Sequence, residues 1–240
     1  MSKQYLMGGR QPVIFCDYDG TITEEDVIQM VMREFAPPEW KTIVADILDH
    51  RRLSIKDGLS QLFGLLESSR REEITQFVIE HVHFRIGFEA LLSFCEARQI
   101  PFLVVSGGVD FIITPVLDRL KSPLQLFCSH ARFDETRIQI DMPWLPKACE
   151  ECNQCACCKI RIMEDYSTDK YYRITIGDSL TDLGMTERAD LAFARARLLD
   201  YALEKKLPVT EFNDFTDILS VLSMRFDMHL EKLNSAETAV

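Results

Sequence analysis

Apolar runs long enough for a β-strand recur along the chain, and most of them are followed by a segment with helical spacing. An alternation of strands and helices predicts a parallel sheet with helices on both faces. A shorter alternating pattern predicts a hairpin formed by residues 131–134 and 137–141. The apolar runs that predict strands are residues 13–16, 101–105, 124–128, 172–176 and 191–194.

One stretch interrupts this alternation. Residues 24–84 carry apolar positions at helical spacing and no strand pattern, and Pro37-Pro38 ends the first of four predicted helices. The stretch is long for a crossover between two strands, so we interpret it as a helical cap inserted after the first strand. A helical subdomain without contact to the site is the alternative. The expected division is a discontinuous core of residues 1–23 and 85–234, a cap of residues 24–84 and a frayed tail of residues 235–240.

The first strand ends in two carboxylates, Asp17 and Asp19, followed by Gly20 and Thr21. In open α/β sheets, ligands bind at the carboxyl ends of the strands. Two carboxylates this close both stay ionised only if a cation lies between them, or one of them takes a proton. The pattern favours Asp17 as a nucleophile beside Mg²⁺, and Asp19 as an acid/base that also lends its backbone oxygen to the metal. A polar strand-to-helix turn is the alternative.

A second strand runs into Ser106-Gly107-Gly108. A hydroxyl and exposed backbone N–H groups at the start of a helix can hold an anion, and glycine lets the backbone approach a phosphate closely. A tight turn without a ligand is the alternative. The sequence also predicts a phosphate-binding cation on a helix upstream of the strand at 172–176. Lys159 fits best, Arg161 is a rival, and an exposed surface lysine is the alternative.

A third strand runs into Gly177-Asp178-Ser179-Leu180-Thr181-Asp182. Asp178 and Asp182 are four residues apart and share one face of a helix start. Mg²⁺ prefers oxygen ligands, so Asp178, Asp17 and the Asp19 carbonyl together could form the protein part of its coordination shell. Alternatively, these acids only stabilise a helix N-terminus.

Composition narrows the choice of partner and compartment. The 240 residues carry a formal net charge of −11, which disfavours nucleic acid and anionic membranes as main partners. We see no signal-peptide pattern and no apolar run of membrane-spanning length, so we expect a soluble, cytoplasmic protein that acts on a small molecule. The oligomeric state is left open.

Five of the eight cysteines form a compact cluster. Cys16, Cys95 and Cys128 lie in apolar runs and predict buried thiols. A structural zinc knuckle in the cluster is one interpretation, and plain thiols or a disulfide formed on oxidation are the others. The clustered residues are Cys149, Cys152, Cys155, Cys157 and Cys158, and the expected zinc ligands are Cys149, Cys152, Cys155 and Cys158.

The order and spacing of these motifs resemble the haloacid dehalogenase (HAD) superfamily of phosphotransferases over residues 12–205. The resemblance implies a Rossmann-like core with a helical cap and Mg²⁺-dependent hydrolysis of phosphate esters. It implies that Asp17 attacks phosphorus and becomes an aspartyl phosphate, while Asp19 protonates the leaving alcohol and then activates water. The other implied roles are phosphate binding by Ser106, the Gly107 N–H and Lys159, metal binding by Asp178, and support of the site by Asp182.

Within that superfamily, the cap placement is similar to the phosphoserine phosphatase branch, in which an acidic residue nine positions after the nucleophile reads an amino group. Asp26 holds that position. The cap and the cysteine segment look closer to the methionine-salvage phosphatases that act on 2-hydroxy-3-keto-5-methylthiopentenyl-1-phosphate, which sets the expected substrate. A phosphatase of phosphoserine or amino-alcohol phosphates, a phosphotransferase or mutase, and a binding module without turnover are the alternatives. Candidates for the cap surface that selects the leaving group are Arg52, Lys56, Phe63 and His83.

Overall fold

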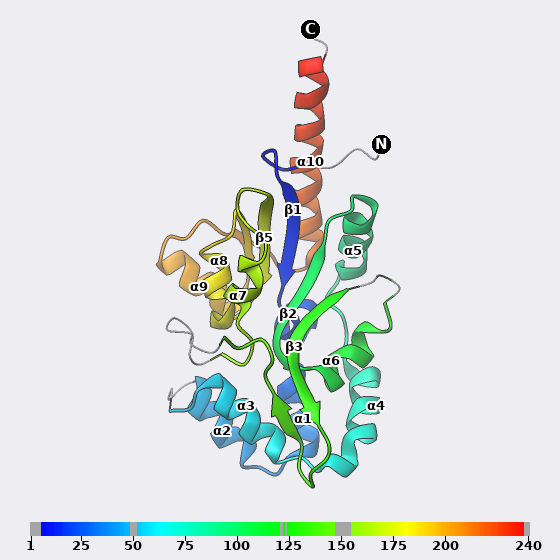
Figure 1. The fold of residues 1–240 in the computed structure, drawn as a ribbon, viewed down its shortest axis with the longest axis vertical. Helices are drawn as coiled ribbons and strands as arrows, with labels where there is room; N and C mark the ends of the chain where they lie inside the picture. The colour runs from blue at the N-terminus through cyan, green and yellow to red at the C-terminus, as the bar shows by residue number, and fades with distance from the viewer. Residues whose placement is uncertain (1–5, 49–51, 121, 123, 147–154, 238–240) are drawn as a thin grey trace. The chain divides into compact units, whose positions relative to one another are not determined.

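The computed structural model describes residues 6–48, 52–120, 122, 124–146 and 155–237, and within them seven strands form one sheet (Figure 1). The strand order is β4-β3-β2-β1-β5-β6-β7. The pairs β1–β5, β5–β6 and β6–β7 are parallel, and β3–β4 is antiparallel. This topology confirms the predicted α/β fold. The strands are β1 (Gln11–Cys16), β2 (Phe102–Val109), β3 (Gln125–Arg132), β4 (Gln139–Asp141), β5 (Tyr171–Gly177), β6 (Leu191–Ala194) and β7 (Thr210–Glu211).

The strand order reverses between β1 and β5. From β1 the chain builds β2 and β3 on one side, and from β5 it builds β6 and β7 on the other. Such a switch point is where open α/β sheets bind their ligands, outside the carboxyl ends of the strands. The predicted motifs at residues 17–21 and 177–182 follow these two strands.

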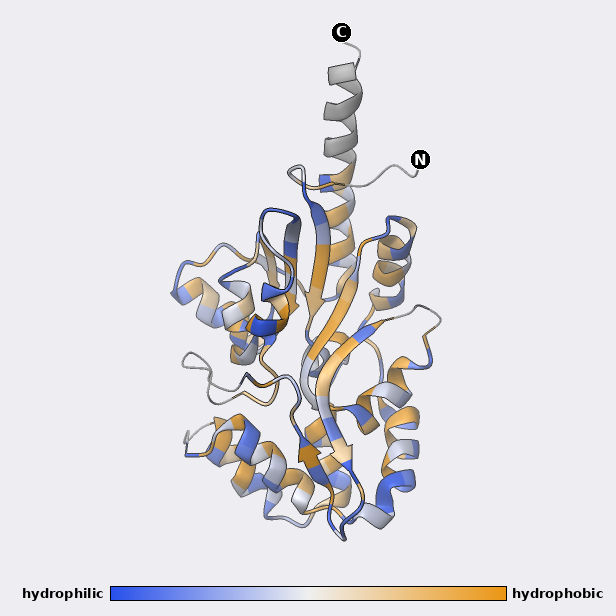
Figure 2. Cartoon of the chain, in the orientation of Figure 1, coloured by the Kyte–Doolittle hydropathy of each residue, from blue (hydrophilic) through white to orange (hydrophobic). Residues whose placement is uncertain are grey.

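The chain divides into two compact units, the first of which contains residues 1–16, 85–103 and 163–240. In this unit β1 pairs with β5 in the register Cys16↔Ile176. All of β1 after Gln11 is buried, in agreement with its hydrophobic colouring in Figure 2. The helices of this unit are α5 (Phe88–Ala97), η3 (Leu180–Asp182), α8 (Leu183–Thr186), α9 (Ala196–Glu204) and α10 (Phe215–Glu237).

The second unit contains residues 17–84 and 104–162. Among the described residues of 24–84 the regular elements are helices, as predicted, and Glu67 and Phe84 form isolated bridges. Their two ends are joined by a bridge between Thr23 and Phe84 and by a hydrogen bond from Glu24 N to His83 O of 3.1 Å. The helices of this unit are η1 (Tyr18–Ile22), α1 (Val27–Phe35), α2 (Trp40–Leu48), α3 (Ile55–Gly64), η2 (Ser68–Arg70), α4 (Arg71–His81) and α6 (Asp110–Leu117). One further helix, α7 (Lys159–Glu164), starts in this unit and ends in the first unit.

Two elements extend further than the sequence pattern predicts. β2 continues through Ser106 to Val109, and within it the Ser106 side chain accepts the Gly108 N–H. α10 continues through Ser235 to Glu237, past the expected start of a tail. No glycine or proline follows Phe215 to stop this helix. None of the described helices is both long and apolar enough to cross a membrane.

Candidate active site

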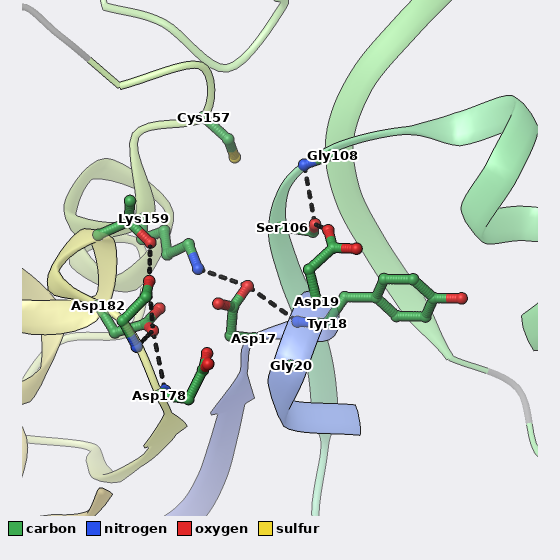
Figure 3. A network of polar contacts seen from close by, with 12 residues as sticks. Asp17, Tyr18, Asp19, Gly20, Ser106, Gly108, Cys157, Lys159, Asp178 and Asp182 are labelled. Atoms are coloured by element: carbon green, nitrogen blue, oxygen red, sulfur yellow. Dashed lines mark hydrogen bonds and ion pairs between the residues drawn. The ribbon is translucent and has the colours of Figure 1, made fainter. Parts of the chain in front are cut away.

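Asp17 leaves the end of β1 with its carboxylate already engaged (Figure 3). Its Oδ1 accepts the backbone N–H of Tyr18 at 2.8 Å and lies 2.6 Å from the Lys159 Nζ. The side chains of Lys159 and Asp17 are only 4% and 7% exposed. Two donors on one oxygen fix the rotation of the carboxylate, so Asp17 is held in a defined orientation.

Asp19 immediately precedes Gly20, whose φ of +73° is unfavourable for other residues. Its Oδ1 accepts the N–H of Val27, the first residue of α1, at 3.0 Å. Its Oδ2 lies 3.5 Å from the Ser106 Oγ, at the limit of a hydrogen bond. The Asp19 carboxylate therefore bonds to the start of α1 through one oxygen and lies near Ser106 of β2 through the other.

Ser106, within β2, is fully buried and organises the backbone that follows it. Its Oγ accepts the Gly108 N–H at 2.9 Å. A Cβ on Gly108 would lie 3.0 Å from both Asp19 Oδ2 and Ile113 Cδ1, whereas a Cβ on Gly107 would meet nothing within 4 Å. Gly108 is therefore a packing requirement of the site. The glycine pair in the sequence indicates a close approach of the backbone, but it does not distinguish Gly108 from Gly107.

Lys159 is the first residue of α7 and is 5% exposed, whereas Arg161 on the same helix is exposed. The structure thus pairs Lys159, and not its rival, with Asp17. Next to Lys159 lies the Cys157 thiol (Figure 3), which contacts the Phe127 carbonyl at 3.8 Å. Burial raises the pKa of this thiol to about 12, against the opposing effect of the Lys159 charge. Cys157 is therefore a neutral neighbour of the ion pair at physiological pH.

In the first unit, the loop after β5 is organised by Asp182. This fully buried carboxylate accepts three hydrogen bonds through Oδ2, from Asp178 N at 3.2 Å, Ser179 N at 3.1 Å and Ser179 Oγ at 3.3 Å. Ser179 and Asp182 form a capping box at the start of η3. A Cβ on Gly177 would come within 2.6 Å of the Asp182 carboxylate. The expected supporting role of Asp182 thus has a clear geometry, since it fixes the loop that carries Asp178.

The register of the first unit relates the two carboxylate motifs through chain connectivity. Cys16 pairs with Ile176. Asp17 follows Cys16 directly, and Asp178 follows Ile176 after a single glycine. Because β1 and β5 are parallel neighbours, both motifs leave the sheet at its carboxyl edge, on either side of the switch point. Their donors are carboxylate and carbonyl oxygens, the ligands that Mg²⁺ prefers.

Asp26, the residue expected to read a substrate amino group, has a structural role in this fold. It caps α1, with Oδ1 accepting Gln29 N at 2.9 Å and Oδ2 accepting Gln29 Nε2 at 3.0 Å. The candidates for the cap surface differ in their surroundings. Arg52 is 3.7 Å from Asp46, Lys56 lies in the first turn of α3, Phe63 is fully buried, and His83 is exposed.

The expected zinc site falls partly outside the described residues, which include neither Cys149 nor Cys152. Of the members that the structure does describe, Cys155 is half-buried, and Cys157 and Cys158 are buried. Within the described part of the chain, these three thiols do not come together as a set of metal ligands. The structure therefore gives no support to zinc at this segment.

Comparison with known proteins agrees with this geometry. Residues 14–187 match the family model of haloacid dehalogenase-like hydrolases. A 2-hydroxy-3-keto-5-methylthiopentenyl-1-phosphate phosphatase from Bacillus velezensis is 41% identical over 87% of this chain and 88% of its own length. The protein of the same name from Geobacillus kaustophilus is 41% identical over 89% of this chain and 96% of its own length.

Solved structures extend the likeness to the fold. A phospho-aspartyl intermediate analogue of phosphoserine phosphatase has a TM-score of 0.67 and 20% identity, and the match covers 88% of this chain and 99% of that one. A substrate-bound phosphoserine phosphatase complex has the same TM-score at 19% identity, with coverage of 88% and 97%. The matched motifs, the sheet topology and the relatives together show that the chain belongs to the family of haloacid dehalogenase-like hydrolases.

Proposed function

We propose that this protein is a Mg²⁺-dependent phosphatase that hydrolyses a small phosphate monoester through an aspartyl phosphate on Asp17. The observation that carries the proposal is the buried ion pair between Asp17 and Lys159 at the end of β1. The desolvation cost of a buried ion pair can equal or exceed its electrostatic gain, so stability alone is a weak reason for its presence. A nucleophile held beside a phosphate-binding cation gives the pair a functional reason.

Asp17 supplies the attacking oxygen. The Lys159 charge and the Tyr18 N–H both stabilise its carboxylate form and fix its orientation. Phosphoryl transfer needs mainly positioning and charge neutralisation, and a preset carboxylate serves the first need. Attack on phosphorus forms the Asp17–phosphate bond and breaks the bond to the leaving oxygen.

Asp19 moves the protons. It donates one to the leaving oxygen, and it then takes one from the water molecule that attacks the aspartyl phosphate. Ser106 Oγ, the Gly107 N–H and the Lys159 Nζ bind the phosphoryl oxygens, and the open space at Gly107 supports close approach of an anion. Ser106 and Gly107 belong to β2, and Lys159 is the first residue of α7.

The residues proposed to hold Mg²⁺ are Asp17, Asp178 and the backbone carbonyl of Asp19, which belong to the motifs that follow β1 and β5. All of these donors are oxygens, and Asp17 is buried, which suits a hard cation that balances carboxylate charge. When bound, the ion supplies charge neutralisation for the phosphoryl group. Asp182 keeps the loop of Asp178 in place through its bonds to two backbone N–H groups.

The proposed substrate is 2-hydroxy-3-keto-5-methylthiopentenyl-1-phosphate, the compound in the name of relatives that are 41% identical to this chain. The reaction would belong to methionine salvage in the cytoplasm, with residues 24–84 as the cap over a core of residues 1–23 and 85–234. Phosphoserine is the second candidate, because the fold resembles that of phosphoserine phosphatases and Asp26 stands nine residues after Asp17.

A phosphate-release screen with Mg²⁺ tests the proposal. We expect the enol phosphate above to be hydrolysed with a higher kcat/KM than phosphoserine. Asp17→Asn should lose at least about a hundredfold in kcat, because a covalent step is removed. Release of phosphate by Asp17→Asn at the parent rate would exclude Asp17 as the nucleophile. Transfer of the phosphoryl group to an added alcohol, instead of incorporation of oxygen from labelled water, would identify a phosphotransferase.

A further inference from the structure

The chain passes from β2 into α6 at Asp110, directly after the phosphate-binding motif. Val109 is the last residue of β2, and Asp110 is the first residue of α6. Asp110 is half-buried, and its Oδ1 accepts two backbone N–H groups, from Phe111 at 2.8 Å and from Ala131 at 2.9 Å. Ala131 lies on β3, the strand beside β2 in the sheet. One carboxylate oxygen therefore joins the start of the helix to the neighbouring strand.

This arrangement differs from an ordinary helix cap. A capping carboxylate usually accepts an N–H group two or three residues further along its own helix. Asp110 accepts the N–H of the next residue and that of Ala131, 21 residues away in the sequence. Hydrogen bonds to an ionised acceptor are stronger than those between neutral groups. The carboxylate thus serves the junction between helix and strand, where β2 has ended and no longer supplies backbone acceptors.

Short connections link this junction to the phosphate-binding motif. The Ser106 Oγ accepts the Gly108 N–H at 2.9 Å. A Cβ on Gly108 would lie 3.0 Å from the Ile113 Cδ1, so α6 packs directly on the glycine. A single residue, the fully buried Val109, separates Gly108 from Asp110. A displacement of the helix start would therefore be passed to the groups that are proposed to bind the phosphate.

We propose that Asp110 is a positioning residue for phosphate binding, which holds the start of α6 against β3 and thereby orients the Ser106 hydroxyl and the Gly107 N–H. The inference rests on the proposed function and deepens it, since it adds to the phosphate site a residue outside the motifs. The whole arrangement lies within residues 104–162 of the second unit. Asp110 does not itself bind the phosphate, because like charges repel and its Oδ1 is already engaged by two N–H groups.

Binding of inorganic phosphate in the presence of Mg²⁺, measured by titration calorimetry, tests this role without turnover. Asp110→Ala should weaken phosphate binding at least about tenfold, because hydrogen bonds to a charged group are lost and the helix start is released. The affinity for Mg²⁺ alone should stay within about twofold of the parent, since the proposed metal ligands follow β1 and β5. Asp110→Asn keeps an oxygen acceptor and should recover phosphate affinity to within about threefold of the parent. The kcat/KM for the proposed substrate should change in the same order.

The alanine variant should fold, because Phe111 also packs edge-to-face on Phe133, the residue after β3, with ring centroids 5.2 Å apart. Hydrogen exchange of the Ala131 amide should become faster in this variant. Asp110→Glu is a second variant that keeps the charge but lengthens the side chain, and it should lose more phosphate affinity than Asp110→Asn. Asp118→Ala is the matched control, since it removes an exposed carboxylate just past the other end of α6. We expect it to bind phosphate as the parent does.

The outcomes distinguish this inference from the proposed function. A parent that binds phosphate but hydrolyses no phosphate ester refutes the proposed function, while the Asp110 variants still decide the positioning role. Equal phosphate affinities for the parent and Asp110→Ala overturn the positioning role alone, and so do equal affinities for the parent and Asp110→Glu if the alanine variant does not fold. An equal loss of phosphate and Mg²⁺ affinity also overturns it, because it shows general damage to the site. A parent that binds no phosphate overturns both.

Discussion

The Lys159 Nζ lies 2.6 Å from the Asp17 Oδ1, with both side chains almost completely shielded from water. Removing one partner of such a pair leaves a buried charge without compensation, at a cost of about 3–5 kcal/mol. Removing both partners avoids that cost. The pair therefore allows the effects on stability and on catalysis to be separated.

Lys159→Met should lower kcat by about a hundredfold to a thousandfold, because a preorganised donor to the phosphoryl oxygens is lost. The same variant should have a reduced free energy of unfolding in urea. The double variant Asp17→Asn with Lys159→Met should recover stability without recovering phosphate release. Arg161→Met, a substitution of an exposed cation on the same helix, is the control and should keep parent kinetics. If Arg161→Met instead causes the loss, the phosphate-binding cation has been assigned to the wrong residue.

Asp178→Asn should weaken Mg²⁺ binding at least about tenfold, since it replaces a charged oxygen ligand of a hard cation with a neutral one. The loop itself should survive, because the Asp178 N–H donates to Asp182 independently of the Asp178 side chain. Titration calorimetry with Mg²⁺ alone measures the affinity. Glu187→Gln makes the same change in net charge at an exposed position in the first unit and should bind Mg²⁺ as the parent does. Equal affinities for Asp178→Asn and the parent would remove Asp178 from the metal site.

Gly108→Ala should destabilise the protein by about 1–3 kcal/mol, the usual cost of inserting a methyl group into a packed site. The added Cβ would lie 3.0 Å from the Asp19 Oδ2 and 3.1 Å from the Ser106 Oγ, so kcat should fall as these two groups shift. Gly107→Ala meets nothing within 4 Å and should keep the parent free energy of unfolding. Urea unfolding compares the two, and similar losses in both variants would mean that the backbone here is not packed as tightly as the structure indicates.

The sequence predicts β1, β2 and β6 well because these strands are buried along most of their length and appear as continuous apolar runs. The predicted run at residues 191–194 matches β6, and the hairpin around Glu135-Thr136 appears as β3–β4. β7 was not predicted, since its two residues are too few to show a pattern. The sequence predicts that the strand at residues 101–105 ends in Ser106-Gly107-Gly108, whereas β2 continues to Val109.

The site could be predicted to the level of residue type and motif, and less well to the level of individual contacts. The sequence indicates Asp17 because it follows the first predicted strand, and Lys159 because it lies at the start of a predicted helix upstream of the strand at residues 172–176. It could not reveal that Asp19 bonds to Val27, or that Arg137 caps α3, because both contacts join residues that local periodicity does not relate. The bridge between Glu67 and Arg137 likewise depends on the register of the hairpin against the helical segment, and such long-range pairing leaves no local signal.

Stability at alkaline pH should depend on three buried thiols. Burial raises the pKa of Cys95 and of Cys157 to about 12, and it raises that of Cys128 further. In the unfolded chain a thiol loses its proton near pH 8.5. Their contribution is therefore complete below about pH 8.5 and is lost as the pH rises toward the folded values, because only the unfolded state releases protons in that window.

Each thiol should lower the free energy of unfolding by up to about 1.4 kcal/mol per pH unit between about pH 9 and 12. Urea unfolding at pH 7.5, 9 and 10.5 measures the slope. Cys95→Val removes one titrating group from α5 at nearly constant volume, so its slope should be shallower than that of the parent, while stability at pH 7.5 changes little. Lysine and tyrosine titration is common to both proteins and cancels in this comparison. Parallel slopes would mean that Cys95 exposes its thiol to solvent in the folded state, contrary to its position in the core.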